Sequence, residues 1–178
     1  MTRTSRPVAL LTGAIAASVV AAGIGVWLVS PSRIPVTTGP AAGAGFNFTP
    51  HAAPRPLPPL HFTDAGGRQQ SLGDFRSRLV LLNLWATWCA PCRKEMPTLD
   101  RLQVRLGGRG FEVVALSIDH KGLAAVRPFY LELGLKALHI YFDQSGSAAS
   151  LLAAPGLPTT LLVDQEDREI GRLVGPAE

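Results

Sequence analysis

Short apolar runs alternate with helix-like stretches from residue 60 to the end of the chain. Residues 78–86 and 111–119 are nearly continuous apolar runs, as expected for strands buried on both faces of a parallel or mixed sheet. Between them, residues 91–106 carry apolar side chains at the spacing of an amphipathic helix. Weaker patterns predict a hairpin from residue 60, a helical turn at 71–75, helices at 123–133 and 147–154, and strands at 138–143, 159–164 and 168–174. This order of elements predicts an α/β sandwich around a central sheet.

The N-terminal part of the chain has the pattern of a membrane anchor. Residues 8–29 contain no charged side chain, and as a helix they would span about 33 Å, enough to cross a hydrocarbon core of about 30 Å. Residues 1–7 carry Arg3 and Arg6, so the positive-inside rule places them in the cytoplasm. A cleaved signal peptide is the alternative, although its apolar region usually spans only about 7–15 residues. Both interpretations predict that the rest of the chain is exported.

Residues 30–59 are rich in Pro, Gly and Ala and have no periodic apolar face. Such a segment cannot bury a core, so the pattern predicts a linker that joins the anchor to a domain at residues 60–178. The excess positive charge of the chain, formally +4, also lies before that domain, and charges of both signs balance from residue 60 onward. A nucleic-acid-binding domain would carry a basic face of its own, so this function class is excluded.

Both cysteines lie in one short stretch, WATWCAPCRKEMP, as Cys89 and Cys92. As a structural staple this pair is weak, because so small a ring gains only about 2 kcal/mol. A zinc site needs about four ligands, and no histidine of the chain stands at ligand spacing to the pair. Soft Cu(I) accepts two thiolates, so a copper-binding function stays open. No resident metal or other cofactor is predicted.

A reactive pair agrees best with the local pattern. Cys89 follows a buried strand and precedes a helix, where the free N–H groups and the helix dipole stabilise a thiolate. Cys92 lies one turn further along, more shielded but within reach of Cys89. We therefore expect a working Cys89–Cys92 disulfide, with Cys89 as nucleophile and Cys92 as the resolving thiol.

With these motifs the chain resembles thioredoxin-fold proteins, and specifically the membrane-anchored TlpA/ResA group of bacterial thiol:disulfide oxidoreductases. Residues 85–102, WATWCAPCRKEMPTLDRL, are similar to that group almost throughout, including Pro97 inside the helix. Residues 156–160, GLPTT, match its second motif. The resemblance implies a thioredoxin-like α/β fold with a mixed sheet flanked by helices, from about residue 60 to the end. It also implies a final helix that this sequence does not contain.

The resemblance implies roles for several further residues. It makes Pro158 a cis-proline that lies against the cysteines and leaves the backbone of Leu157 free to pair with a substrate strand. Glu95 occupies the position of an acid that tunes the thiols, although an acid early in a helix is also favoured by the dipole alone. Asn83 stands where cytosolic thioredoxins have a buried acid, and its neutral amide cannot act as a base. The expected substrate contacts are Trp88, Pro91, Leu157, Pro158 and Thr159; for Trp88 ordinary core packing is the alternative.

The function implied by this resemblance is reduction of disulfides in exported proteins, at a bacterial inner membrane with the domain on the periplasmic side. Its substrates would be the oxidised thiols of apocytochrome c or of cytochrome oxidase copper sites. A donor in the membrane would supply the electrons. The alternative is a Cu(I)-binding assembly factor similar to the Sco-like proteins, which space their cysteines by three residues and add a histidine. A peroxidase similar to the peroxiredoxins would have a Thr-x-x-Cys site. It is disfavoured, because Thr87 stands only two positions before Cys89.

Overall fold

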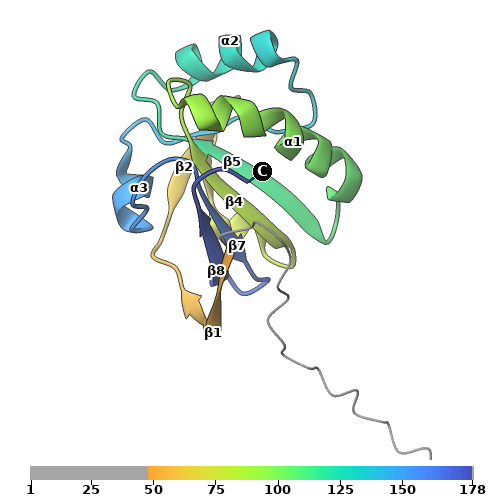
Figure 1. Ribbon diagram of the computed structural model, residues 1–178, viewed down its shortest axis with the longest axis vertical. Coiled ribbons are helices and arrows are strands. Elements are labelled where there is room, and N and C mark those ends of the chain that lie inside the picture. The colour runs from red at the N-terminus through yellow and green to blue at the C-terminus, as the bar shows by residue number, and fades with distance from the viewer. Residues whose placement is uncertain (1–47, 178) are drawn as a thin grey trace, which may run out of the picture. The chain divides into compact units, whose positions relative to one another are not determined.

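The computed structural model describes residues 48–177 and shows a mixed sheet with helices on both faces (Figure 1). Its eight strands follow the order β1-β8-β7-β4-β5-β6-β2-β3. The strands are β1 (Phe48–Pro56), β2 (His61–Asp64), β3 (Gln69–Ser71), β4 (Leu79–Trp85), β5 (Phe111–Ser117), β6 (Tyr141–Phe142), β7 (Thr159–Val163) and β8 (Arg168–Val174). The helices are η1 (Leu72–Phe75), α1 (Ala90–Leu106), α2 (Leu123–Leu133) and α3 (Ser147–Leu151). The predicted α/β sandwich around a mixed sheet is confirmed.

The two apolar runs form the centre of the sheet, β4 and β5, which pair in parallel. Side chains alternate between the two faces of a strand, so each face of β4 and β5 builds its own core. On one face, Leu82 and Leu84 pack with residues of η1 and α3. On the other face, Trp85 packs with residues of α1 and α2. This double burial explains why both runs lack the polar alternation of a half-exposed strand.

The linker predicted at residues 30–59 ends earlier in the structure, because residues 48–56 form the edge strand β1. β1 pairs antiparallel with β8, and the ring of Phe48 lies directly over Gly171, which has no side chain in the way. The composition misled the prediction because Pro is tolerated on an edge strand, where its missing N–H faces outward. The compact domain therefore begins before residue 60.

Two further elements are shorter than predicted. The strand expected at 138–143 is only β6, because Asp100 Oδ1 accepts hydrogen bonds from the backbone N–H groups of residues 136–138 and holds them near α1. The helix expected at 147–154 ends at Leu151, and Ala153 has a left-handed backbone with φ of 48°. Both differences arise from contacts or backbone geometry that local apolar patterns do not carry.

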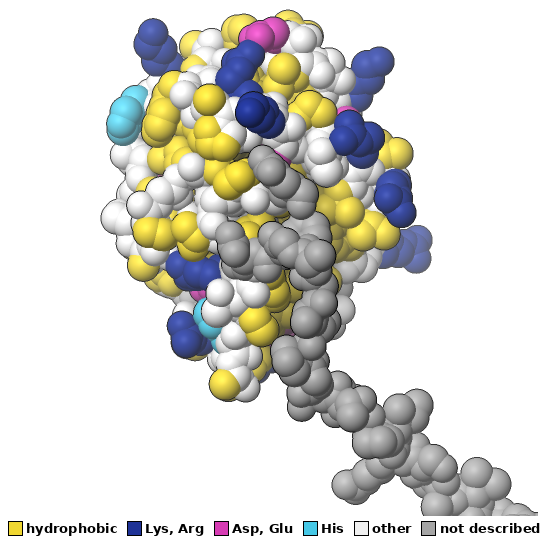
Figure 2. Space-filling model, in the orientation of Figure 1, with side chains coloured by type: hydrophobic (Ala, Val, Ile, Leu, Met, Phe, Trp, Pro, Cys, Tyr) yellow, Lys and Arg dark blue, Asp and Glu magenta, His cyan; other side chains and the backbone are white. Residues whose placement is uncertain are grey.

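The predicted N-terminus at 1–7 and anchor at 8–29 lie outside the described residues. Among residues 48–177 no helix has the length and apolar character needed to cross a membrane. On the face drawn in Figure 2, basic side chains are spread over the upper face and along the edges rather than gathered in one patch.

Candidate functional site

The cysteine pair lies where β4 leads into α1, above one end of the sheet. Cys89 is the N-cap residue of α1, and its Sγ accepts a hydrogen bond of 3.2 Å from the backbone N–H of Cys92. A disulfide joins the two, with Cα atoms 5.3 Å apart. Cys89 is 5% exposed and Cys92 is fully buried, so only the first sulfur is near the surface. Pro91 stands in the first turn of the helix, where a missing N–H costs nothing.

A mostly apolar groove of about 470 Å³ opens beside Cys89. Trp88, Pro91 and Leu157 are among the residues that line the groove. The indole of Trp88 is 70% exposed, so the core-packing alternative for this residue is wrong. A groove of this kind next to a reactive sulfur can hold an extended peptide segment.

The second motif, residues 156–160, borders this groove, and Gly156 and Leu157 line it. The Leu157–Pro158 peptide bond is cis, as the resemblance implied. Pro158 and Thr159 are buried and do not line the groove, in contrast to the substrate contacts expected of them. The hydroxyl of Thr159 donates a 2.7 Å hydrogen bond to the carbonyl of Gly156 and thereby holds the loop in shape.

Glu95 is buried on the same face of α1 as the cysteine pair. It lies beyond the first turn, which contains no acid, so the helix dipole does not explain it. Its Oε1 accepts 2.8 Å from Asn83 Nδ2, and its Oε2 accepts 3.0 Å from the N–H of Ala177. Burial raises the pKa of Glu95 above its ordinary value, and the bonds from Ala177 and Asn83 lower it only in part. A buried acid with a raised pKa suits proton transfer near the thiols.

Sequence reasoning missed Asp119, which holds the segment before Cys89. One of its carboxylate oxygens accepts 2.8 Å from the hydroxyl of Thr87, and the other accepts 2.9 Å from the Thr87 N–H and 2.7 Å from the hydroxyl of Ser117. Asp119 is only 5% exposed. Its position as the last residue of an apolar run, at the end of the sheet where β4 also stops, was the available signal.

Replacing Asp119 by alanine is expected to loosen this segment. Thr87 and Ser117 lose a charged acceptor, so the free energy of unfolding should fall by about 2 kcal/mol. Because Trp88 and Cys89 follow Thr87, thiol–disulfide exchange should slow about tenfold. Chemical denaturation and stopped-flow exchange measure the two effects. Asp74→Ala is the control, since Asp74 is exposed and outside the groove; an unchanged exchange rate in Asp119→Ala would contradict the role.

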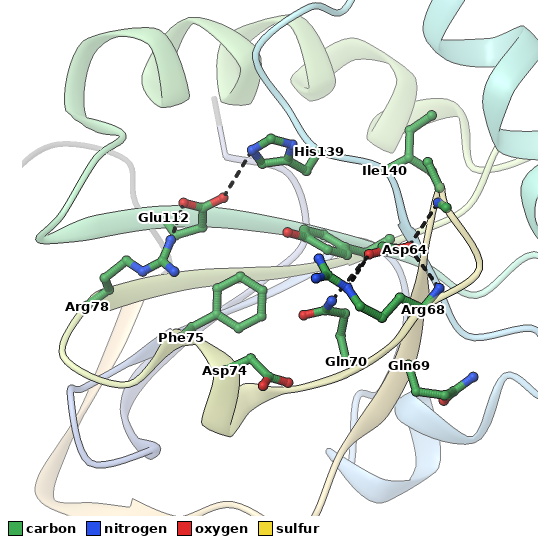
Figure 3. Close-up of a pocket in the computed structure, with 13 residues that line it drawn as sticks. Asp64, Arg68, Gln69, Gln70, Asp74, Phe75, Arg78, Glu112, His139 and Ile140 are labelled. Atoms are coloured by element: carbon green, nitrogen blue, oxygen red, sulfur yellow. Dashed lines mark hydrogen bonds and ion pairs between the residues drawn. The ribbon is translucent and has the colours of Figure 1, made fainter.

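A cavity of about 590 Å³ lies away from the cysteines (Figure 3). Its charges pair with one another: Arg78 Nη1 lies 2.8 Å from Glu112, and Asp64 accepts from both Arg68 and Gln70. His139, at the rim, lies 3.9 Å from Glu112. Among residues 48–177 no three His, Cys, Asp or Glu side chains gather as metal ligands would. Four charged groups that line the cavity, Arg78, Glu112, Asp64 and Arg68, therefore already have a partner of opposite charge.

The sheet with helices on both faces, a Cys-x-x-Cys disulfide at the start of α1 and a cis-proline loop beside it define a thioredoxin-fold protein of the thiol–disulfide class. The chain belongs to the redoxin family, whose model matches residues 47–178. That match begins close to β1 and includes every site residue described above.

Known relatives and solved structures agree with this class. The chain is 34% identical over 113 residues to the "Thiol-disulfide oxidoreductase ResA" of Bacillus thuringiensis subsp. konkukian, a match that covers 64% of each chain. A crystal structure of a putative thiol:disulfide interchange protein DsbE from Chlorobium tepidum has a TM-score of 0.63 at 27% identity, and covers 70% of this chain and 86% of its own. A DsbF homologue from Corynebacterium diphtheriae has a TM-score of 0.62 at 25% identity, with 75% and 87% covered. The predicted fold and family are confirmed.

Proposed function

We propose that this protein is a thiol:disulfide oxidoreductase that reduces disulfides in exported proteins. The observation that carries the proposal is the Cys89–Cys92 disulfide at the N-terminus of α1, with one sulfur at an open groove and the other buried. A disulfide that served only to stabilise the fold would not require a neighbouring groove. The names of the relatives, thiol-disulfide oxidoreductase and thiol:disulfide interchange protein, support the same chemistry.

The catalytic cycle follows from the different exposure of the two sulfurs. In the reduced protein the Cys89 thiolate, stabilised by the helix N-terminus, attacks one sulfur of the substrate disulfide and releases the other as a thiolate. Cys92 then loses its proton to Glu95 and attacks Cys89 Sγ. The mixed disulfide breaks, the substrate leaves with both cysteines reduced, and the protein holds the disulfide seen in the structure. A dithiol donor restores the reduced state.

Recognition of the substrate involves the groove and the loop before β7. An extended substrate segment in the groove would lie between Trp88 and Leu157, and the backbone of Leu157 would pair with it as an added strand. The small and apolar groove walls favour a short, uncharged stretch around the substrate cysteine. Haem-binding cysteines of apocytochrome c and copper-site cysteines of cytochrome oxidase are the substrates suggested by the resemblance to the TlpA/ResA group.

The cellular place is part of the proposal. The uncharged run at residues 8–29, preceded by two arginines, supports a single-pass anchor in a bacterial inner membrane with the domain on the periplasmic side. An anchored domain remains close to a membrane donor of electrons, which a reductase requires in an oxidising compartment.

The reduction potential of the cysteine pair tests the proposed direction. We expect a value well below about −200 mV in a defined thiol buffer, and reduction of a peptide that carries a Cys-x-x-Cys-His disulfide. A potential near −120 mV, with oxidation of the reduced peptide, would contradict a reductase. Tight Cu(I) binding by the reduced protein without any exchange would favour the copper-binding alternative instead.

A further inference from the structure

Asn83 is a buried amide whose hydrogen bonds are unevenly distributed. It lies on β4 opposite Thr160 of β7, with no exposed surface. Both hydrogens of its Nδ2 are used, one toward Glu95 Oε1 at 2.8 Å and one toward Thr160 Oγ1 at 2.9 Å. Its Oδ1 is equally buried and has no hydrogen-bond partner among the described residues. The amide is therefore oriented so that its N–H groups donate two hydrogen bonds, while its carbonyl oxygen receives none.

The acid that receives this bond has few other partners. Glu95 forms no ion pair with any described residue, and its second oxygen is bound only by the backbone N–H of Ala177. The groups that bind it from β4 and residue 177 are neutral. Arg93 and Lys94 precede it in α1 and form no ion pair with it, and Cys92 lies one turn before it on the buried face of the helix. The charge of Glu95 is thus stabilised by two neutral donors, of which Asn83 is the only side chain.

We propose that Asn83 is a positioning residue for the redox reaction, which binds the charged form of Glu95 and thereby sets the pH at which Glu95 exchanges a proton with the cysteine pair. The proposal rests on the proposed function. An acid at position 83 would share a proton with Glu95, since two carboxylates in contact cannot both ionise. An apolar residue there would leave only the Ala177 N–H to stabilise the charge. The amide keeps the Glu95 oxygen fixed while carrying no charge of its own.

The proton balance shows where Asn83 acts. Reduction of the protein's disulfide breaks the S–S bond and takes up two electrons and two protons from a dithiol donor. Cys89 gives up its proton to solvent when it becomes the attacking thiolate. When the buried Cys92 later attacks Cys89 Sγ, its proton passes to Glu95 and from there to solvent, and the two electrons leave with the substrate, whose two thiolates take up two protons. Stabilising the carboxylate through Asn83 Nδ2 makes Glu95 a weaker base, so that the acid can release the proton again before the next cycle.

The test measures the reduction potential against pH, between about pH 4 and pH 9. We expect the wild-type curve to contain a bend that belongs to Glu95, and this bend to disappear in Glu95→Gln. In Asn83→Leu the bend should move upward by about one to two pH units, because a buried hydrogen bond to a charged group is lost. In the Glu95→Gln background the same Asn83→Leu change should have no effect on the curve.

Two further variants keep the test decisive. Thr160→Val removes the other partner of the amide but leaves its bond to Glu95, so the bend should stay where it is. If Asn83→Leu folds poorly, Asn83→Leu/Thr160→Val removes both polar partners together, which costs less than stranding one. An unmoved bend in the Asn83 variants, an equal change in the Glu95→Gln background, or a wild-type curve without a Glu95 bend would overturn the inference. The measurement needs only reversible reduction of the pair, so failure to reduce a substrate disulfide would count against the proposed function alone.

Discussion

Replacing Cys92 by serine is expected to stop turnover completely and to leave the protein joined to its substrate. Cys89 reaches the groove and can still attack, but without the buried thiol nothing displaces the substrate from Cys89 Sγ. A stable mixed disulfide should therefore accumulate, with a stoichiometry of one. The substrate is the peptide that carries a Cys-x-x-Cys-His disulfide. Non-reducing electrophoresis and intact-mass spectrometry detect the adduct.

Cys89→Ser is the matched control for this experiment. It should form no adduct, since Cys92 is fully buried and does not line the groove. The opposite pattern, with the adduct on Cys92, would reverse the assignment of nucleophile and resolving thiol. Normal turnover by either single variant would exclude the two-cysteine cycle.

The parts of this site that sequence alone predicts are those encoded locally. The pairing of Cys89 with Cys92, and their place between a buried strand and an amphipathic helix, follow from residues that are neighbours in the chain. The thioredoxin-like fold follows from the same patterns together with the resemblance. The cis bond before Pro158 was implied by the resemblance too, and is present.

The parts that sequence did not predict depend on contacts between distant residues. Glu95 is surrounded by Asn83 and Ala177, the latter 82 positions away, so neither its burial nor its partners can be inferred from α1. Asp119 contacts Thr87 across 32 positions. Trp88 was expected beside the site, with core packing as the alternative; it lines the groove next to Cys89 and is largely exposed. The strand β1 was not predicted, because its Pro- and Ala-rich sequence is typical of a linker.

Another contact between distant residues is a charged cluster of His51, Glu169 and Arg172, which links β1 to β8. Glu169 on β8 is 2% exposed, and His51 of β1 lies 2.8 Å from its Oε1. Arg172 binds both carboxylate oxygens at 2.6 Å and also donates 3.1 Å to the carbonyl of Leu152. Burial alone would raise the pKa of Glu169, but the hydrogen bonds and charges of Arg172 and His51 outweigh it and lower the pKa. The cluster therefore stabilises the fold through the ionised form of Glu169.

Glu169→Ala is expected to lower the free energy of unfolding by about 3 kcal/mol at neutral pH, because it leaves a partly buried arginine without its counter-charge. Since the pKa of Glu169 is lower in the folded state, this stability is fully present above the unfolded value of about 4.3. It is lost as the pH falls through the folded pKa, so wild type and variant should converge in acid. Urea denaturation at a series of pH values measures the difference. Glu166→Ala is the matched control, because Glu166 is exposed and pairs only with Arg168; its effect should stay within about 0.5 kcal/mol.

Hydrogen exchange in Glu169→Ala shows which part of the fold the cluster holds. β1 lies at the edge of the sheet and β4 at its centre, so loss of the cluster should speed exchange of the β1 amides first and leave β4 protected. Equal acceleration in both strands would mean that the cluster stabilises the whole domain rather than its edge. A stability equal to wild type at neutral pH would contradict the role altogether. Selective opening would identify the cluster as the contact that holds the edge strand β1 to the rest of the sheet.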